Sequence, residues 1–294
     1  MKHPRVAIIT RTKDRPVFLK RAIQSVLDQT FSDWVHVIVN DGGDKVLVED
    51  LLTTFADAYQ DRVCVVHHDR SRGMQNASNA GLAAVESVYV VIHDDDDSWY
   101  PDFLEKTVGC LEEQGPHSRI QGVVTQTTQV TEEICLDGRI VRLKQNPYYP
   151  FDYVNLGEMR HRNIFPPIAF LYRRAAHERV GGFRQEFDVL GDHDFNLRFL
   201  RFFDITVIPT AHAYYHWRYG SHGNTVTRSR NTHRRMLNRM KNTYWREALD
   251  RSERAVGDID GIEFPPPDGG EMLPFNLRPD EPAAPRPLPG FRAD

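Results

Sequence analysis

Short apolar runs alternate with helical patterns through the first hundred residues of the chain. Four runs predict buried strands: RVAIIT at 5–10, WVHVIVN at 34–40, RVCVVHH at 62–68 and VYVVIH at 88–93. After the first run, apolar residues recur at helical spacing and Asp14 is the predicted N-cap; they are Leu19, Ala22, Ile23, Val26 and Leu27. Strands that alternate with helices predict an α/β fold with a Rossmann-like, mostly parallel central sheet and helices on both faces.

Polar residues follow each of the four predicted strands. They occupy positions 10–14, 40–43, 69–72 and 94–97. In an open parallel sheet, ligands bind beyond the carboxyl ends of the strands. We therefore expect these four loops to converge on one edge of the sheet and to form a binding site there.

The second half of the chain has a less regular pattern. It predicts strands at 120–130, 169–174, 205–210 and 211–219, a short helix at 173–182 and a strongly apolar helix at 192–203. From Phe264 onward, nine of the chain's 18 prolines fall within about thirty residues. Such a segment cannot build a core, so residues 264–294 are predicted to be an extended or flexible tail.

Composition and charge narrow the class of protein. The chain has 294 residues, of which 40% are hydrophobic and 27% charged, as in an ordinary globular protein. A net charge of -4 gives no overall attraction to nucleic acid. The three cysteines, Cys64, Cys110 and Cys135, have neither metal-site nor disulfide-framework spacing, which favours a reducing cytoplasm. We expect neither a signal peptide at residues 1–10 nor a membrane span, since no apolar run approaches the roughly 20 residues required.

The segment HDDDDSWYP at 93–101 carries four adjacent carboxylates at the end of a predicted central strand. A run of acidic residues is often a solvated loop that also caps the next helix. Here Trp99 and Tyr100 follow at once, which is unusual for a solvent-facing tip. A hard divalent cation such as Mg²⁺ or Mn²⁺ would offset the repulsion, since it binds carboxylates together with phosphate oxygens. The chain has no glycine-rich phosphate loop, so arginines such as Arg11 and Arg72 are expected to meet phosphate charge.

Five segments, in order, resemble those of family 2 glycosyltransferases, which have the GT-A fold. They are the strand–helix–strand block at 6–43, RGMQNASNAGL at 72–82, HDDDDSWYP at 93–101, VGGFRQEFDVLGDHDFNLRFL at 180–200 and YGSHGNT at 219–225. The resemblance implies a GT-A domain over 1–227, with a nucleotide-sugar half at about 1–101 and an acceptor half at about 102–227. A basic helical extension (228–263) and the Pro-rich tail (264–294) lie beyond it.

The resemblance also implies roles for individual residues. Asp41 would bind the nucleotide base or ribose, with Thr10 and Arg11 near the base, and Arg72 would approach the diphosphate or the sugar. In the Asp-x-Asp motif, Asp96 would be the direct metal ligand, while Asp94, with its neighbour Asp95, would face the ribose or donor sugar. The four consecutive aspartates leave a slip of one residue open. His222 is the candidate third metal ligand; alternatively, it is a loop residue that binds no metal.

A family 2 resemblance implies inversion at the anomeric carbon, which requires a base for the acceptor hydroxyl. Asp192 aligns with that base, although an aspartate at a helix start is also a common N-cap. Asp194 is the less favoured choice, because it can pair with Arg198 one turn later.

The resemblance gives a metal-dependent (Mn²⁺ or Mg²⁺) inverting hexosyltransferase as the expected enzyme. A UDP-sugar is the expected donor, with a glycan or lipid-linked acceptor in polysaccharide or surface-glycan biosynthesis. A nucleotidyltransferase and a catalytically idle GT-A module are the alternatives. The basic segment Arg228–Arg246 contains no acidic residue, so it is either a solvated helix or a peripheral contact with the inner face of a membrane.

Overall fold

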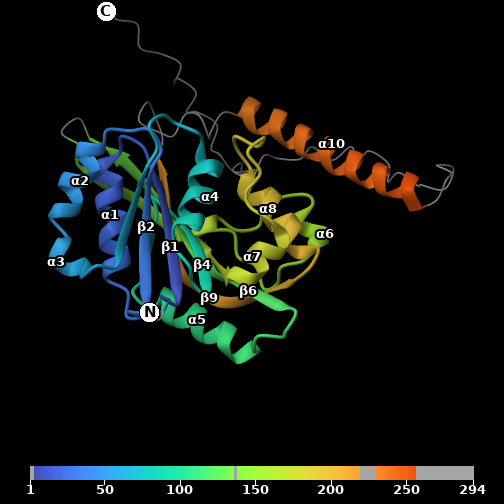
Figure 1. The fold of residues 1–294 in the computed structure, drawn as a ribbon, viewed down its shortest axis with the longest axis horizontal. Coiled ribbons are helices and arrows are strands. Elements are labelled where there is room, and N and C mark those ends of the chain that lie inside the picture. The colour runs from blue at the N-terminus through green and yellow to red at the C-terminus, as the bar shows by residue number, and fades with distance from the viewer. Residues whose placement is uncertain (1–2, 136–137, 219–229, 256–294) are drawn as a thin grey trace, which may run out of the picture.

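The computed structural model describes residues 3–135, 138–218 and 230–255, and Figure 1 shows how they are arranged. The first half contains β1 (Val6–Thr12), α1 (Pro16–Leu27), β2 (Trp34–Asn40), α2 (Lys45–Thr53), α3 (Ala56–Tyr59), β3 (Val63–His67), α4 (Met74–Ala84), β4 (Tyr89–Asp94) and β5 (Ser98–Trp99). β1 pairs in parallel with β2 and β4, and β2 pairs in parallel with β3. The four predicted strands therefore form a parallel sheet, and their carboxyl ends share one edge.

The second half extends the same sheet. It contains α5 (Phe103–Gln114), β6 (Ile120–Ile134), β7 (Ile140–Pro147), α6 (Leu156–Met159), the 3₁₀ helix η1 (Pro167–Ala169), β8 (Phe170–Arg173), α7 (Arg174–Val180), α8 (Gly191–Leu200), β9 (Asp204–Arg218) and α10 (Arg230–Ala255). Among the described residues the sheet has nine strands in the order β3-β2-β1-β4-β8-β6-β9-β5, with β7 paired to β6. β8 is antiparallel to both β4 and β6, whereas β9 is parallel to β6. The predicted α/β class is confirmed, with a mixed rather than parallel second half.

The two strands predicted at 205–210 and 211–219 are one long strand, β9. The register between β6 and β9 shifts where Thr125 faces Ile208 and the next residue, Gln126, faces Ala211. Pro209 lies in that interval and has no N–H to donate to the ladder. The break in the apolar pattern therefore marks a bulge, and β9 continues beyond it.

The predicted helix start at Asp14 is wrong. α1 begins at Pro16 with Arg15 at the N-cap, and no side chain caps its N-terminus. Asp14 instead has a φ of 52°, and its carboxylate accepts a hydrogen bond of 2.8 Å from the backbone N–H of Asp44. This contact joins the loop after β1 to the start of α2, so Asp14 organises the edge of the sheet where the strands end.

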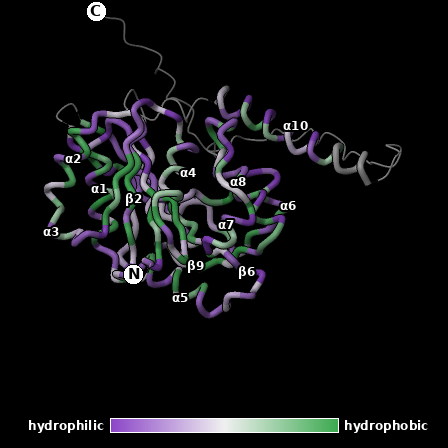
Figure 2. Tube along the Cα trace, viewed as in Figure 1, coloured by the Kyte–Doolittle hydropathy of each residue, from purple (hydrophilic) through white to green (hydrophobic). Residues whose placement is uncertain are grey.

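The core lies on the strands of the sheet, where Figure 2 shows the hydrophobic residues concentrated. Val6, Ile8 and Ile9 of β1 and Val90 of β4 are fully buried. α10 lies at the surface beside α8 (Figure 1) and contributes the buried side chains of Met236 and Met240 to the core. Within the described parts of the chain, every helix is too short or too polar to span a bilayer.

Candidate functional site

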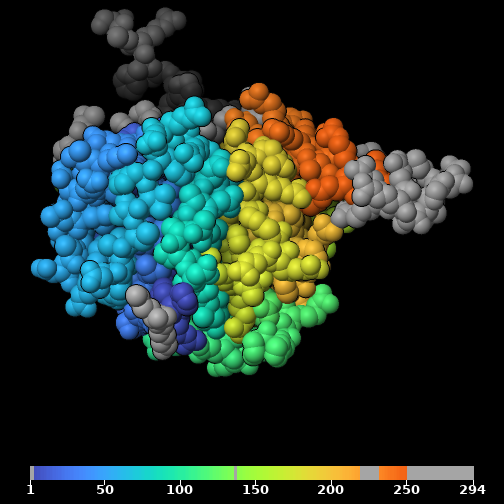
Figure 3. Space-filling model, in the orientation of Figure 1, coloured from blue at the N-terminus to red at the C-terminus, as the bar shows by residue number. Residues whose placement is uncertain are grey.

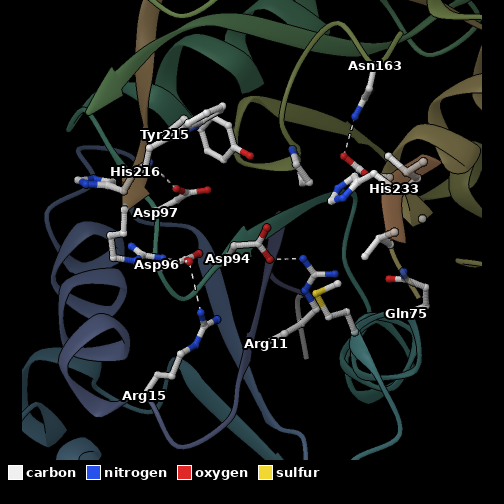
Figure 4. Close-up of a pocket in the computed structure, with 18 residues that line it drawn as sticks. Arg11, Arg15, Gln75, Asp94, Asp96, Asp97, Asn163, Tyr215, His216 and His233 are labelled. Carbon is white, nitrogen blue, oxygen red and sulfur yellow. Dashed lines mark hydrogen bonds and ion pairs between the residues drawn. The ribbon is translucent and has the colours of Figure 1, made fainter. Parts of the chain in front are cut away.

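A cavity of about 170 Å³ lies at the edge of the sheet where β1 and β4 end (Figure 4). Arg11 and Asp94 come from these two strands, Gln75 from the first turn of α4, Asp192 from the first turn of α8, and Tyr215 from β9. Small-molecule sites usually have volumes of about 300–1,000 Å³, so this cavity accommodates only part of a ligand of nucleotide size. Its position is the one predicted from the loops that follow the parallel strands.

Arginines surround the acidic run. Arg11 pairs with Asp94, and Arg15 pairs with both Asp95 and Asp96. Arg218, at the end of β9, also pairs with Asp96. Burial acts to raise the pKa of Asp96, but the charges of Arg15 and Arg218 outweigh it and the pKa is lowered. The protein's own cations therefore offset a large part of the repulsion that the sequence suggested a metal must relieve.

Glu132 on β6 holds Arg218 and a further arginine, Arg21, in place. Its carboxylate accepts hydrogen bonds from Nη1 of Arg21 at 2.7 Å, Nη1 of Arg218 at 2.9 Å and Nδ1 of His216 at 2.8 Å. Burial acts to raise the pKa of Glu132, but hydrogen bonds from His216 and Arg21 outweigh it and lower the pKa to about 2. Arg21 also donates to the backbone carbonyl of Asp96, so Glu132 orients both arginines toward the acidic run.

Asp95 and Asp97 are the buried members of the run. Burial raises the pKa of Asp95 to about 7 against the opposing charge of Arg15. Asp97 accepts a hydrogen bond of 2.9 Å from the backbone N–H of His216 through Oδ1, and burial raises its pKa well above the usual range. Its Oδ2 is buried and has no hydrogen-bond partner among the described residues, although Asp97 contributes to the cavity wall. The carboxylates in this run are therefore not equivalent.

Asp192 is the second residue of α8 and lines the cavity. Leu190 is the N-cap residue, in a left-handed conformation with φ of 64°, and no side chain caps this N-terminus. The alternative role of Asp192 as the N-cap of this helix is therefore wrong. A Cβ on Gly191 would lie 2.5 Å from Cδ of Gln75, so the Gln75 side chain packs directly against the start of α8. This close packing directs Asp192 to the cavity.

Hydrogen bonds and burial define the state of Asp192. Its Oδ2 accepts a hydrogen bond of 2.6 Å from Nδ2 of Asn163. Burial raises its pKa, and the charge of Asp94 adds to that effect. Asp194 behaves differently: it is fully buried and pairs with Arg198 at 2.9 Å, which confirms the predicted i, i+4 contact. Asp194 also accepts a 2.9 Å hydrogen bond from the hydroxyl of Tyr244 on α10, so it serves to join helices.

Four of the predicted nucleotide- or donor-binding residues lie outside the cavity wall: Thr10, Asp41, Arg72 and Asp95, the last with a fully buried side chain. Thr10 is fully buried and its hydroxyl bonds Nε2 of His36 at 2.8 Å, so its side chain belongs to the core. Asp41 lies beneath the loop after β3, where its carboxylate accepts from the backbone N–H groups of Arg72 (2.8 Å) and Gly73 (2.9 Å). The side chain of Arg72 is exposed.

The carboxylate of Asp41 organises this loop. Burial acts to raise its pKa, but the hydrogen bonds from Arg72, His68 and Ser71 lower it overall. A Cβ on the preceding loop's Gly42, which has φ of 76°, would lie 2.2 Å from the backbone nitrogen of Ser71. The close approach of the two loops therefore requires a glycine at this position.

The metal ligands were predicted to be Asp96 and His222. His222 lies outside the described residues, and the described residues contain no group of three or more His, Cys, Asp or Glu side chains arranged to hold a metal. Asp94 and Asp96 nevertheless line the cavity with carboxylate oxygens, the ligand type that Mg²⁺ and Mn²⁺ prefer. The oxygen chemistry of this wall suits a hard divalent cation.

Six residues that surround the predicted ones were not predicted: Arg15, Arg21, Glu132, Asn163, His216 and Arg218. Arg15 directly follows the first polar loop, and Arg218 lies at the end of the apolar strand before the YGSHGNT segment, so the positions of both in the sequence pointed to the site. Glu132 and Asn163 had no such positional signal, because each acts through partners more than 25 positions away.

Comparison with known proteins agrees with this architecture. The family model for "Glycosyl transferase family 2" matches residues 7–181. The uncharacterized glycosyltransferase YwdF of Bacillus subtilis is 24% identical over 219 residues, covering 72% of this chain and 74% of YwdF. A PGL/p-HBAD biosynthesis glycosyltransferase of Mycobacterium bovis is 26% identical over 200 residues, covering 67% of this chain and 70% of that protein.

Solved structures show the same fold at low sequence identity. S. aureus TarS 1-349 in complex with UDP-GlcNAc superposes with a TM-score of 0.57 at 18% identity, covering 74% of this chain. The mannosyltransferase PcManGT from Pyrobaculum calidifontis, in complex with GDP-Man and Mn²⁺, gives 0.53 at 16% identity over 73% of this chain. This chain spans about 60% of the TarS 1-349 structure and 57% of PcManGT. The fold is therefore GT-A, and with its family model matched over more than half its length, the chain belongs to glycosyl transferase family 2.

Proposed function

We propose that this chain transfers a sugar from a nucleoside-diphosphate donor to an acceptor hydroxyl, with inversion at the anomeric carbon and Asp192 as the general base. One observation carries the proposal: a single cavity is lined by Asp192 and also by the arginine-paired carboxylates Asp94 and Asp96. Asn163, the hydrogen-bond partner of Asp192, lies across this cavity from Asp96 and Arg15 in Figure 4. An in-line displacement needs a base on one side of the sugar and charge stabilisation on the other.

In the proposed step, the ionised carboxylate of Asp192 takes the proton of the acceptor hydroxyl. The acceptor oxygen then bonds to the anomeric carbon as the bond from that carbon to the diphosphate oxygen breaks. Burial raises the pKa of Asp192, which makes its carboxylate a stronger base than an exposed aspartate. The ionised form is needed, so activity should fall as the pH drops through this pKa.

The other wall would hold the donor. Arg11 and Arg15 provide positive charge near Asp94 and Asp96, and Asp96 would be the direct metal ligand, with Asp94 toward the ribose or sugar. A bound Mn²⁺ or Mg²⁺ would neutralise charge on the leaving diphosphate. The solved structures with this fold were obtained with UDP, UDP-GlcNAc, and GDP-Man with Mn²⁺, which supports a nucleotide-sugar donor, and we propose a UDP-sugar.

We further propose a glycan or lipid-linked acceptor at an anionic membrane surface. The relatives include a PGL/p-HBAD biosynthesis enzyme and a putative teichuronic acid biosynthesis enzyme of B. subtilis, TuaG, which is 30% identical over 111 residues. α10 turns Met236 and Met240 toward the core and leaves Arg234, Arg239 and Arg246 exposed, and Figure 3 shows it along one side of the molecule. Basic residues near an anionic bilayer each contribute about 1 kcal/mol of attraction.

The membrane contact is tested with vesicles. The whole chain should sediment with phosphatidylglycerol vesicles at low salt and remain free with phosphatidylcholine alone. The double variant Arg234→Glu/Arg239→Glu should lose this binding, whereas Arg119→Glu/Arg160→Glu, at exposed positions elsewhere, should keep it. Equal binding by both variants would remove α10 from this role.

The catalytic proposal is tested with Asp192→Asn. This variant keeps the shape of the side chain, so it should bind UDP with Mn²⁺ as the native protein does, measured as a thermal shift. Its transfer rate should fall by about 10²–10⁴-fold because a general base is removed. Asp188→Asn, at an exposed position four residues earlier, is the matched control. Unchanged turnover in Asp192→Asn would show that another group is the base, and no nucleotide-sugar turnover by the native chain would favour the idle module.

The donor is identified by a thermal-shift screen of nucleoside diphosphates and nucleotide sugars, each with and without Mn²⁺. A ligand that binds only the folded state raises the melting temperature by mass action, so the cognate nucleotide should give the largest shift. A shift that does not depend on Mn²⁺ would contradict the metal-assisted mode of binding.

A further inference from the structure

Asn163 belongs to an irregular segment between α6 and η1 and lines the cavity. Only 3% of its surface is exposed. Its Nδ2 donates to Oδ2 of Asp192 at 2.6 Å, and its Oδ1 accepts from Nδ2 of Asn196 at 3.0 Å. One side-chain amide therefore bridges two residues that lie one turn apart on α8.

The contacts with Asp192 and Asn196 together fix which way the Asn163 amide faces. The ionised carboxylate of Asp192 can only accept, and Asn196, itself 3% exposed, donates through Nδ2 to the other end of the amide. Rotating the Asn163 amide by 180° would place two NH₂ groups against each other and the amide oxygen against the Asp192 carboxylate. Both contacts would be lost in a buried place, where unpaired polar groups are costly. The donor end of Asn163 is therefore held toward Asp192.

A second contact ties the same segment to α8. Nε2 of His193 lies 2.6 Å from the backbone carbonyl of Met159, at the end of α6. Together with the Asn163 bridge, it fixes the first turn of α8 against the 159–163 segment on two successive residues, Asp192 and His193. A carboxylate held in this way loses little rotational freedom when a substrate arrives.

We propose that Asn163 is a positioning residue for Asp192: its amide, locked by Asn196, commits Oδ2 of the carboxylate and leaves Oδ1 to receive the acceptor proton. The inference rests on the proposed function, because it takes Asp192 as the base. Asn163 also donates to the ionised form of Asp192, which favours that form in a buried site. Asn163 thus has two effects, on the orientation of the base and on the pH at which it works.

Other groups also influence Asp192, and the test keeps them constant. The charged and titratable groups near it are Arg11 on β1, Asp94 on β4, His193 on α8, Tyr148, Tyr215 on β9 and His233 on α10. None of them is changed in the variants below.

Two variants of Asn163 separate the effects. Asn163→Ala removes the donor, and Asn163→Asp keeps the shape but replaces the donor by a second carboxylate. The assay measures UDP release from UDP-GlcNAc in the presence of Mn²⁺. We expect kcat to fall by about 10–100-fold in Asn163→Ala, the usual cost of losing a residue that orients a catalytic group. KM for the donor should change by less than about 2-fold. The pH at which kcat rises should move upward in Asn163→Ala and further in Asn163→Asp, since a like charge disfavours ionisation. His161→Ala, at an exposed position in the same segment, is the control.

A measurement without a substrate covers the case in which UDP-GlcNAc is not turned over. Carboxyl ¹³C NMR of the aspartates, with the Asp192 signal assigned from Asp192→Asn, follows its titration directly. The titration should move upward in the order native, Asn163→Ala, Asn163→Asp. An unmoved titration would overturn the proposal.

A double variant distinguishes failure of this inference from failure of the proposed function. If Asn163 acts through Asp192, adding Asn163→Ala to Asp192→Asn should lower kcat no further. A large additional loss would show that Asn163 acts by another route. An inactive Asp192→Asn with a fully active Asn163→Ala would refute only the positioning role, whereas a fully active Asp192→Asn would refute the base assignment on which it rests.

Discussion

Glu132→Gln should destabilise the protein strongly at neutral pH and much less in acid. Glu132 is 2% exposed and its carboxylate accepts from Arg21, His216 and Arg218. The substitution keeps the volume but leaves the buried guanidinium of Arg218 and the half-buried guanidinium of Arg21 without their shared anion. It also turns the NH₂ group of the new glutamine toward hydrogen-bond donors. Removing one partner of a buried ion pair typically costs about 3–5 kcal/mol.

The pKa of Glu132 gives an independent magnitude. It lies at about 2 in the folded protein, against an ordinary value of 4.5. At about 1.4 kcal/mol per pH unit, this difference corresponds to about 3 kcal/mol of stability at neutral pH. Because the folded-state pKa is depressed, the contribution is fully present above pH 4.5 and is lost as the pH falls toward 2. By pH 3 it should have decreased by about 2 kcal/mol.

Urea unfolding of the native protein and of Glu132→Gln, followed by circular dichroism at several pH values from 7 down to 3, measures this directly. The two free energies of unfolding should differ by about 3 kcal/mol at pH 7 and converge toward pH 3. Glu133→Gln, at the exposed next residue of β6, should match the native protein throughout. Equal stability of native and Glu132→Gln at pH 7, or a gap that does not shrink in acid, would refute the network as the source of the depressed pKa.

Three further substitutions test other parts of the structure. Gly109 lies inside α5, where a Cβ would meet nothing within 4 Å. Gly109→Ala should therefore raise the free energy of unfolding, measured in urea, by about 0.5–1 kcal/mol. A lower free energy of unfolding would mean that there is no open space at this position. At Gly42, φ is 76° and a Cβ would lie 2.2 Å from the backbone nitrogen of Ser71. Gly42→Ala should therefore lower the free energy of unfolding by at least about 2 kcal/mol and weaken UDP binding measured by calorimetry. If neither value changed, the close approach of the two loops would be contradicted. Tyr244→Phe removes the hydroxyl that donates to Asp194, so hydrogen exchange of α10 should accelerate by about tenfold while α5 stays unchanged.

The regular part of the fold could be predicted because periodicity reports burial locally. β1, β2 and β4 are buried on both faces, and their continuous apolar runs locate them within a few residues. The order of β8, β6 and β9 could not be obtained in this way, because pairing between distant strands leaves no periodic signal. The convergence of the loops followed from the parallel strands, so the edge of the sheet that carries the cavity was predictable.

The chemistry around the cavity was only partly predictable. Asp94, Asp96 and Asp192 were identified by their positions after a strand and at a helix start, and all three line the cavity. Thr10 was predicted to end the first strand, but β1 continues to Thr12 and the Thr10 hydroxyl contacts His36. Asp41 does follow a strand, yet its carboxylate is used by the loop at 68–73. The position of a residue at the end of a strand predicts where its side chain lies. The hydrogen bonds that this side chain makes within the protein decide whether it can still bind a ligand.

The alternation of exposure along the acidic run bears on which two aspartates face a donor. Side-chain exposure is 25% for Asp94 and 15% for Asp96, but 0% for Asp95, and Asp97 is 1% exposed. The run forms a turn after β4, closed by a hydrogen bond of 3.1 Å from the backbone N–H of Asp97 to the carbonyl of Asp94, and this turn leaves Asp94 and Asp96 more exposed than Asp95 and Asp97. A slip of one residue would assign donor and metal contacts to Asp95 and Asp97, whose raised pKa values disfavour the ionised form that a cation requires. The Asp-x-Asp spacing is therefore the spacing of the more exposed pair, and the charges of Arg15 and Arg218 lower the pKa of Asp96 at the wall where we propose that a diphosphate lies.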